Sequence, residues 1–183
     1  MLPVPKPITI LVEGESDKAA VVTLLPRFGI DAEAENITVT VINGAGNFGR
    51  AIPETVALGH RVGGLYDEAE EHFVADALNR QAGEDLTRQG FFASRPDLEL
   101  ELVRAVGAVA MTPLLEQHGD LKTFRNFQDQ PKYRDADVVE QLRRYIGANG
   151  ARKAKYAAIL VEALEFGAFP EPLEGIVNWI WSA

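Results

Sequence analysis

A short β-branched strand that ends in an acidic residue constrains the fold of this chain most strongly. Residues Ile8–Val12 form a continuous, mostly apolar run typical of a buried parallel strand. Glu13 follows directly, and after a glycine turn the residues from Ser16 onward favour a helix, for which we predict Ser16 as the N-cap. Glu13 then lies at the carboxyl end of a strand and Asp17 in the first turn of a helix, at the edge where open parallel sheets bind ligands.

The chemistry of this turn indicates a cation site. Hard divalent cations prefer oxygen ligands, and Glu13 and Asp17 place two carboxylates four residues apart at the expected ligand edge. Glu15 lies between them, and we interpret it as a solvated acid near the start of the helix. We therefore take Glu13 and Asp17, and not Glu15, as candidate site residues.

Strands and helices alternate through the first half of the sequence. Such a β-α-β-α-β-α-β order predicts a parallel sheet sandwiched by helices, an α/β fold. We predict further strands at 37–42, 61–66 and 90–93, and helices at 50–58 and 68–81.

The second half of the sequence is mainly helical by periodicity. We predict helices at 97–106, 111–117, 121–127, 137–146, 151–164 and 172–181. Trp179 and Trp181 are expected to anchor the last helix on the body. A chain of 183 residues can bury one good core, so we expect a single domain over residues 1–183, with an α/β core at about 8–94 and a helical extension at about 95–183.

The net charge of the protein limits how it can bind nucleic acid. With 18 basic and 27 acidic residues the net charge is −9, whereas proteins that bind nucleic acid unaided usually have a basic surplus. A nucleic-acid role would therefore need a metal, a partner or a local basic patch. Arg143, Arg144 and the stretch Arg152–Lys155 are candidates for such a patch, or else form the solvated face of two helices.

Composition also excludes several classes of site and location. The chain has no cysteine, which removes disulfides, thiolate zinc sites and cysteine nucleophiles. Its apolar runs are far shorter than the roughly 20 residues needed to span a bilayer. Residues 1–7 lack the pattern of a signal peptide and are expected to form an extended leader. We therefore expect a cytoplasmic protein with no membrane partner.

Two further acidic sites follow predicted strands. Asp67 ends the strand at 61–66, so it shares a sheet edge with Glu13, and two such carboxylates can share one magnesium ion. We interpret the next acids, Glu68, Glu70 and Glu71, as residues favoured at a helix N-terminus by the helix dipole. The third site is Asp97–Glu99, where Asp97 is a natural N-cap and Glu99 lies in the first helical turn, so a purely structural interpretation is strong.

A glycine-rich loop at 44–49 leaves a nucleotide-binding alternative open. It matches G-x-G-x-x-G between a strand and a helix, and Asp67 follows Gly49 at about the distance of a ribose-binding acid in dinucleotide folds. The loop lacks the lysine and hydroxyl of a P-loop, which argues against that kind of ATP site. We favour a tight turn that needs glycine backbone angles, with dinucleotide binding as the competitor.

Taken together, the ordered segments resemble the TOPRIM domain in the form found in OLD (overcoming lysogenization defect) family endonucleases. The resemblance implies a TOPRIM/Rossmann-like fold and a divalent-metal-dependent nuclease acting on DNA phosphodiester bonds, here as a stand-alone form without the ATPase domain. The segments that carry it are Val12–Lys18, Gly44–Phe48, Gly64–Asp67, Asp97–Glu99, Gly150–Ala157 and Phe169–Leu173.

The resemblance also implies residue roles and a cofactor. Glu13 would be a metal ligand or general acid/base with Asp17 beside it, and Asp67 would be the first aspartate of a D-x-D metal motif. Asp97 and Glu99 would stand at the ligand positions of a second Mg2+ or Mn2+ ion. Two metals would activate water and hold the leaving oxygen. Lys153 would stabilise charge on the phosphate, with Lys155 as the other possible register. Arg152 and Lys155 are candidate DNA contacts because of their positive charge.

One position departs from the family pattern. The second aspartate of D-x-D falls on Ala69, which cannot bind metal, and the side chains of Glu68 and Glu70 leave the backbone in other directions. The alternatives to a two-metal nuclease are therefore a one-metal enzyme and an inactive module. Such a module would bind metal, nucleic acid or a separately encoded ATPase.

Overall fold

The sheet of this protein is fully parallel, as the alternation of elements predicts. The computed structural model describes residues 6–182, so the predicted leader lies outside it apart from Lys6 and Pro7. The strand order is β2-β1-β3-β4, and every neighbouring pair is parallel. The strands are β1 (Ile8–Val12), β2 (Ile37–Val41), β3 (Arg61–Asp67) and β4 (Phe91–Ser94).

The strand order creates a switch point between β1 and β3. From β1 the chain passes to β2 on one side, and β3 then returns to the other side of β1, where Leu11 pairs with Gly64. In open α/β sheets, ligands bind at the carboxyl ends of strands at such a point. Glu13 directly follows β1 and Asp67 ends β3, so both acids flank this crevice.

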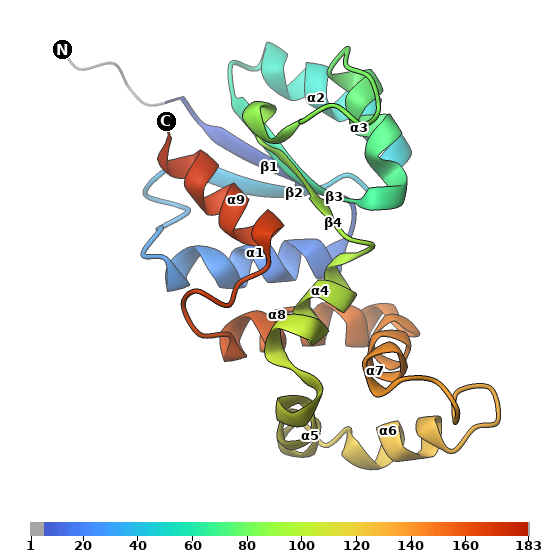
Figure 1. The fold of residues 1–183 in the computed structure, drawn as a ribbon. Coiled ribbons are helices and arrows are strands. Elements are labelled where there is room, and N and C mark those ends of the chain that lie inside the picture. The colour runs from blue at the N-terminus through green and yellow to red at the C-terminus, as the bar shows by residue number, and fades with distance from the viewer. Residues whose placement is uncertain (1–5, 183) are drawn as a thin grey trace.

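Helices cover both faces of the sheet (Figure 1). One face packs on α2 and α3, and the other on α1 and α9. Side-chain alternation along β1 explains the two layers, because Leu11 joins the core under α2 whereas Ile10 and Val12 join the core under α1. The bounds are α1 (Glu15–Arg27), α2 (Phe48–Ala57), α3 (Glu71–Ala77) and α9 (Glu171–Trp181).

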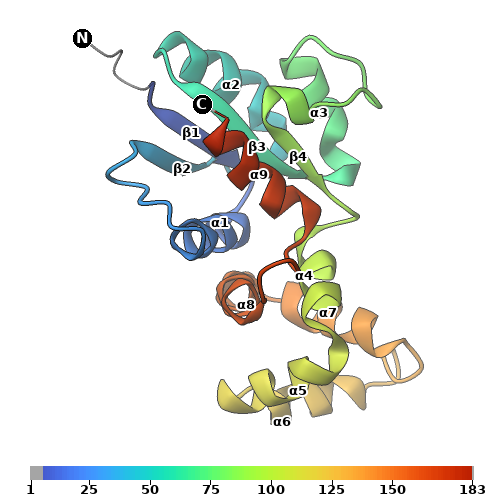
Figure 2. The same cartoon turned by 60° about the vertical axis from the view of Figure 1, so that its left-hand side comes forward.

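The helical half shares the core of one sheet face. Helix α8 lies along α1, and the buried cluster runs from β1 through Leu24 to Leu160 and Leu102 without a break. Figures 1 and 2 show α5, α6 and α7 extending beyond the carboxyl end of the sheet. These helices are α4 (Leu98–Val106), α5 (Ala108–Gln117), α6 (Leu121–Gln128), α7 (Val138–Gly147) and α8 (Gly150–Ala163). Within residues 6–182, no helix has the length and apolarity to cross a membrane.

Trp179 fixes α9 on the sheet through close contacts with glycine. A Cβ built on Gly63 would lie 2.8 Å from the Trp179 ring, and one on Gly90 would lie 2.4 Å from it. The Arg61 guanidinium stacks over the same ring, 4.4 Å from its centroid. Trp179 is therefore an anchor of α9, as predicted. Trp181 is more than half exposed and makes an edge-on contact with Phe28, with ring centroids 6.0 Å apart, so it anchors the helix less than predicted.

Two local predictions were wrong. The first helix is capped by Gly14 and not by Ser16, because the Asp17 carboxylate accepts a hydrogen bond from the Gly14 N–H at 3.0 Å. The third helix begins with a 3-10 turn over Glu68–Glu70 and ends at Ala77 instead of residue 81. It ends there because Asn79 adopts a positive φ of 55° that terminates the helix.

Candidate metal and phosphate site

Four acidic residues and one lysine meet at the carboxyl end of the sheet. Asp67 at the end of β3 interacts electrostatically with Asp17 of α1 and Glu99 of α4. Lys153 of α8 interacts with the same three carboxyl groups, and also with Glu13 at the end of β1. The sequence-predicted residues Glu13, Asp17, Asp67, Glu99 and Lys153 therefore form one cluster.

The ion pair of Lys153 and Glu99 is the most buried contact of the cluster. Lys153 Nζ lies 3.3 Å from Glu99 Oε2, and Glu99 is only 7% exposed. Burial raises the pKa of Glu99, although Lys153 opposes that effect. The pKa of Lys153 is raised in turn, because its carboxylate neighbours, Glu99 foremost, outweigh the effect of burial. The other oxygen, Glu99 Oε1, is buried without a hydrogen-bond partner among the described residues.

Asp67 and Asp17 are held in a low-dielectric setting. Burial, followed by the charges of Asp17 and Glu99, raises the pKa of Asp67 to about 7. Burial also raises the pKa of Asp17, although the hydrogen bond from the Gly14 N–H opposes the rise. Carboxyl groups in such surroundings gain most from a nearby positive charge, whether Lys153 or a cation.

Glu13 interacts with Glu70, which the sequence indicated only as an acid at a helix N-terminus. A hydrogen bond between the carboxyl groups of Glu13 and Glu70, which requires a proton on one of them, and partial burial raise the pKa of Glu13 to about 7. The Glu13 carbonyl also accepts from the Gly44 N–H at 3.3 Å, which ties the end of β1 to the glycine loop. Glu70 therefore adds a carboxyl group next to Glu13 at the end of β1.

Both carboxylate oxygens of Asp97 are already engaged. Oδ1 caps α4 by accepting from the Leu100 N–H at 2.9 Å. Oδ2 accepts from Arg143 through Nε at 2.7 Å and through Nη2. Arg143 also reaches Glu140, which in turn accepts from Arg144 Nε at 2.6 Å. Sequence reasoning placed Arg143 in a surface patch, and nothing in the sequence indicated its pairing with Asp97, because the two residues lie far apart along the chain.

The two candidate lysines have different environments. Lys155 Nζ lies 2.7 Å from Asp120 Oδ2, and the same oxygen accepts from the Tyr156 hydroxyl at 2.8 Å. Arg152 stacks on Tyr145, 4.0 Å from the ring centroid, and donates to its carbonyl. Arg152 and Lys155 thus bind within the helical half, and of the two lysines only Lys153 contacts the acid cluster.

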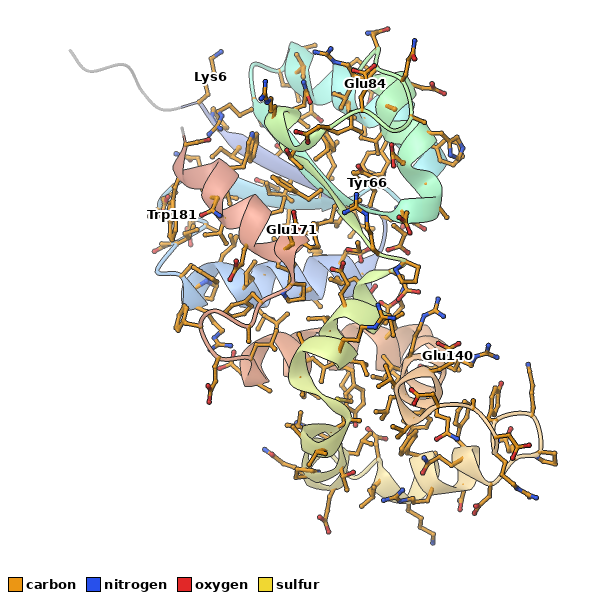
Figure 3. All side chains as sticks on the ribbon, viewed as in Figure 1. Lys6, Tyr66, Glu84, Glu140, Glu171 and Trp181 are labelled. Atoms are coloured by element: carbon orange, nitrogen blue, oxygen red, sulfur yellow. The ribbon has the colours of Figure 1, made fainter. Side chains whose placement is uncertain are left out.

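A cavity of about 420 Å³ opens beside Lys153. It lies between α4 and α7, and Figure 3 shows Glu140 on α7 at the side of the helical half that faces the sheet. Asp97, Glu99, Tyr133, Arg143, Arg144 and Lys153 are among its lining residues. Basic side chains therefore border the acid cluster on this side.

The glycine loop has the geometry of a tight turn. Gly44 adopts φ of 110°, and Asn47 Nδ2 closes the turn by donating to the Ile42 carbonyl at 2.8 Å. The loop follows β2, which is an edge strand, whereas the crevice of this sheet lies between β1 and β3. A dinucleotide site at the loop would lie outside that crevice.

The donor set of the cluster fits a divalent cation of the magnesium type. Among residues 6–182, no three acidic or histidine side chains are gathered closely enough to enclose a metal ion. Magnesium does not need such a cage, because it keeps several waters and takes one or two protein carboxylates. Two buried carboxylate oxygens, Glu99 Oε1 and Glu70 Oε2, have no hydrogen-bond partner in the described part of the chain and are suitable ligands.

Comparisons with known proteins agree with this architecture. The model of the OLD-like TOPRIM family (overcoming lysogenization defect protein-like, TOPRIM domain) matches residues 8–69. No curated protein matches the sequence. Among solved structures, the C-terminal region of the Xanthomonas campestris pv. campestris OLD protein superposes with a TM-score of 0.67 at 20% identity, over 97% of this chain and 95% of that one.

A second solved structure gives the same result. The C-terminal region of the Burkholderia pseudomallei OLD protein superposes with a TM-score of 0.66 at 16% identity, over 97% of this chain and 98% of that one. Both likenesses extend through the helical half, which the family model does not reach. Residues 8–69 therefore match the OLD-like TOPRIM family model, and the chain as a whole has the fold of the C-terminal region of OLD proteins.

Proposed function

We propose that this protein is a divalent-metal-dependent nuclease that hydrolyses DNA phosphodiester bonds with Mg2+ or Mn2+. The observation that carries the proposal is the placement of Lys153 among Asp17, Asp67 and Glu99 at the switch point of the sheet. Phosphoryl transfer needs both anionic metal ligands and a cation that faces the phosphate, and this cluster supplies both kinds of group.

Each residue has a role that follows from its position. Glu13, Asp17, Asp67 and Glu99 would hold metal, which when bound polarises the phosphate and lowers the pKa of a coordinated water. Lys153 projects from α8 into the same space and would donate to a phosphate oxygen as negative charge develops on it. Asp97 is committed to capping α4 and to Arg143, so its contribution is to hold α4 and thereby orient Glu99.

Three basic side chains in the cavity lining, which stand among three acidic ones, support DNA as the substrate. An acidic protein with a net charge of −9 needs a local positive surface to approach a polyanion. Arg143, Arg144 and Lys153 line one cavity beside the acid cluster, which would lead a strand backbone toward it. Arg152 and Lys155 contact Tyr145 and Asp120 and are not among the residues that line this cavity, so they would contribute less than the sequence alone indicates.

The test is DNA cleavage by the purified protein. Supercoiled and linear DNA are incubated with Mg2+ or Mn2+, and Glu13→Ala is compared with Glu15→Ala. Glu15 is an exposed acid in the same turn, so its loss removes the same charge without touching the cluster. We expect metal-dependent cleavage that Glu13→Ala abolishes and Glu15→Ala retains. Absence of cleavage, or cleavage undiminished in Glu13→Ala, would reject the proposal.

A non-catalytic module is the second candidate, and Ala69 is the observation that favours it. A TOPRIM-like protein without the second D-x-D acid could serve only to bind metal, nucleic acid or a separately encoded ATPase. This candidate predicts binding of Mn2+ or DNA with no cleavage. Strong cleavage that requires Glu13 would exclude it.

A further inference from the structure

The side chains of the three residues in the turn after β3 point in three different directions. Glu68, Ala69 and Glu70 form a 3-10 turn, in which successive side chains are about 120° apart because three residues complete one turn. Glu68 is exposed and lies 3.4 Å from Arg95 Nε, on the side of β4. Ala69 is exposed as well. Glu70 is the residue of this turn that points back to Glu13 at the end of β1.

One oxygen of the Glu70 carboxyl group lacks the hydrogen-bond partner that a buried polar atom requires. Glu70 Oε2 is buried, and no donor among residues 6–182 binds it. A buried polar atom without a partner costs roughly 1–3 kcal/mol, more when the group is charged, so it is retained where a ligand completes it. The Glu70 carboxyl group interacts with that of Glu13, which can donate a hydrogen bond only when it is protonated and otherwise brings a second negative charge.

When both are ionised, two facing carboxyl groups at this position need a positive charge between them. Lys153 acts on Glu13, but its ion-pair contact is with Glu99, so it does not bridge Glu13 and Glu70. A divalent cation satisfies two carboxylates at once and completes its shell with water. Both groups flank the switch point, where a ligand is expected on topological grounds.

We propose that Glu70 takes over the metal-binding role left open by Ala69, and that Glu13 and Glu70 together bind one divalent cation. The inference rests on the proposed function for the presence of metal, and it adds a ligand that lies outside the D-x-D positions.

Metal binding without DNA tests the inference. Mn2+ binding is measured by electron paramagnetic resonance and Mg2+ binding by calorimetry, for the full chain and for Glu70→Gln and Glu68→Gln. The two variants remove one negative charge from the same turn, so Glu68→Gln controls for the general loss of electrostatic attraction. We expect Glu70→Gln to weaken Mn2+ binding about tenfold or more, the range seen when metal-site partners are removed, and Glu68→Gln to leave it unchanged.

Thermal unfolding provides a second readout and shows that the variants fold. In chelator, Glu70→Gln should melt at or above the temperature of the unchanged protein, because it removes repulsion between two facing acids. Added Mn2+ should raise the melting temperature of the unchanged protein and of Glu68→Gln, but raise that of Glu70→Gln much less. Equal Mn2+ affinity in Glu70→Gln and the unchanged protein, or no Mn2+ binding by either, would overturn the inference.

These outcomes separate the inference from the proposed function. Metal binding that depends on Glu70 in a protein that does not cut DNA would reject the nuclease and keep the ligand assignment. DNA cleavage that depends on Glu13, with Mn2+ binding unaffected by Glu70→Gln, would reject the ligand assignment and keep the nuclease.

Discussion

Lys153 of α8 and Glu99 of α4 form an ion pair, with Nζ and Oε2 3.3 Å apart, at the point where the helical half meets the carboxyl end of the sheet. The pair joins two helices whose residues are distant in sequence. It also brings a positive charge to acids from β1, β3 and α1. The helical half therefore completes the candidate site as well as extending the core.

Lys153 and Lys155 should differ sharply in their importance for DNA cleavage. Lys153→Met removes the cation that would face the phosphate and should lower kcat by about 10² to 10³, the range for loss of a group that stabilises developing charge. Lys155→Met, two residues along the same helix, breaks the contacts of Lys155 with Asp120 and the His118 carbonyl, which lie outside the acid cluster, and should retain cleavage. Cleavage rates at saturating Mg2+ measure the difference. Equal losses in both variants would contradict the assignment of Lys153.

The same lysine should contribute to stability through Glu99. Lys153→Met leaves a buried carboxylate unpaired, which should lower the free energy of unfolding by roughly 1–3 kcal/mol. Adding Glu99→Gln in that background removes the unpaired charge and should recover part of the loss. Urea unfolding in chelator measures both steps. A double variant less stable than Lys153→Met alone would show that Glu99 is not the partner that matters.

Stability without metal should decrease as pH rises toward neutral. The pKa values of Glu13 and Asp67 are about 7 in the folded protein, against ordinary values of 4.5 and 3.8. Between those limits the folded state binds more protons than the unfolded state, so the free energy of unfolding falls with pH. The protonated Glu13 and Asp67 carboxyl groups therefore contribute fully to stability below about pH 4, and this contribution is lost above about pH 7.

The pH dependence is checked by urea unfolding in chelator across this range. Asp67→Asn removes one of the two groups and should flatten the decrease. A slope of the opposite sign, with stability rising through the same range, would be incompatible with the raised pKa values.

Two glycines should respond in opposite ways to alanine. A Cβ on Gly63 would lie 2.7 Å from the Gly90 carbonyl oxygen and 2.8 Å from Trp179, so Gly63→Ala must displace α9 and should cost about 1–3 kcal/mol. Gly49 lies in α2 with no atom within 4 Å of such a Cβ, and Gly49→Ala should stabilise the helix by about 0.5–1 kcal/mol. Thermal unfolding compares the two. A Gly63→Ala protein as stable as Gly49→Ala would refute the close contact of Trp179.

The sequence by itself determined the α/β class, the parallel sheet and the placement of Glu13 and Asp67 at strand ends. These features follow from local patterns, because β-branched runs, turn residues and helical periodicity act over a few residues. The resemblance carried by short motifs likewise indicated the OLD-like TOPRIM family, and the family model and fold agree with it. The helix boundaries were predicted to within a few residues, and the errors came from side-chain capping by Asp17 and the positive φ of Asn79.

Only the tertiary structure decided which charged groups face one another. The sequence left Lys153 and Lys155 as alternatives. They separate because positions two residues apart on a helix point to nearly opposite sides, here toward Glu99 and toward Asp120. Asp97 had the pattern of a cap, but its second oxygen is taken by Arg143 from a helix far along the chain. Glu70 had the pattern of a helix start, yet the tight 3-10 turn aims it at Glu13. Such pairings depend on how whole elements pack, which local sequence does not encode.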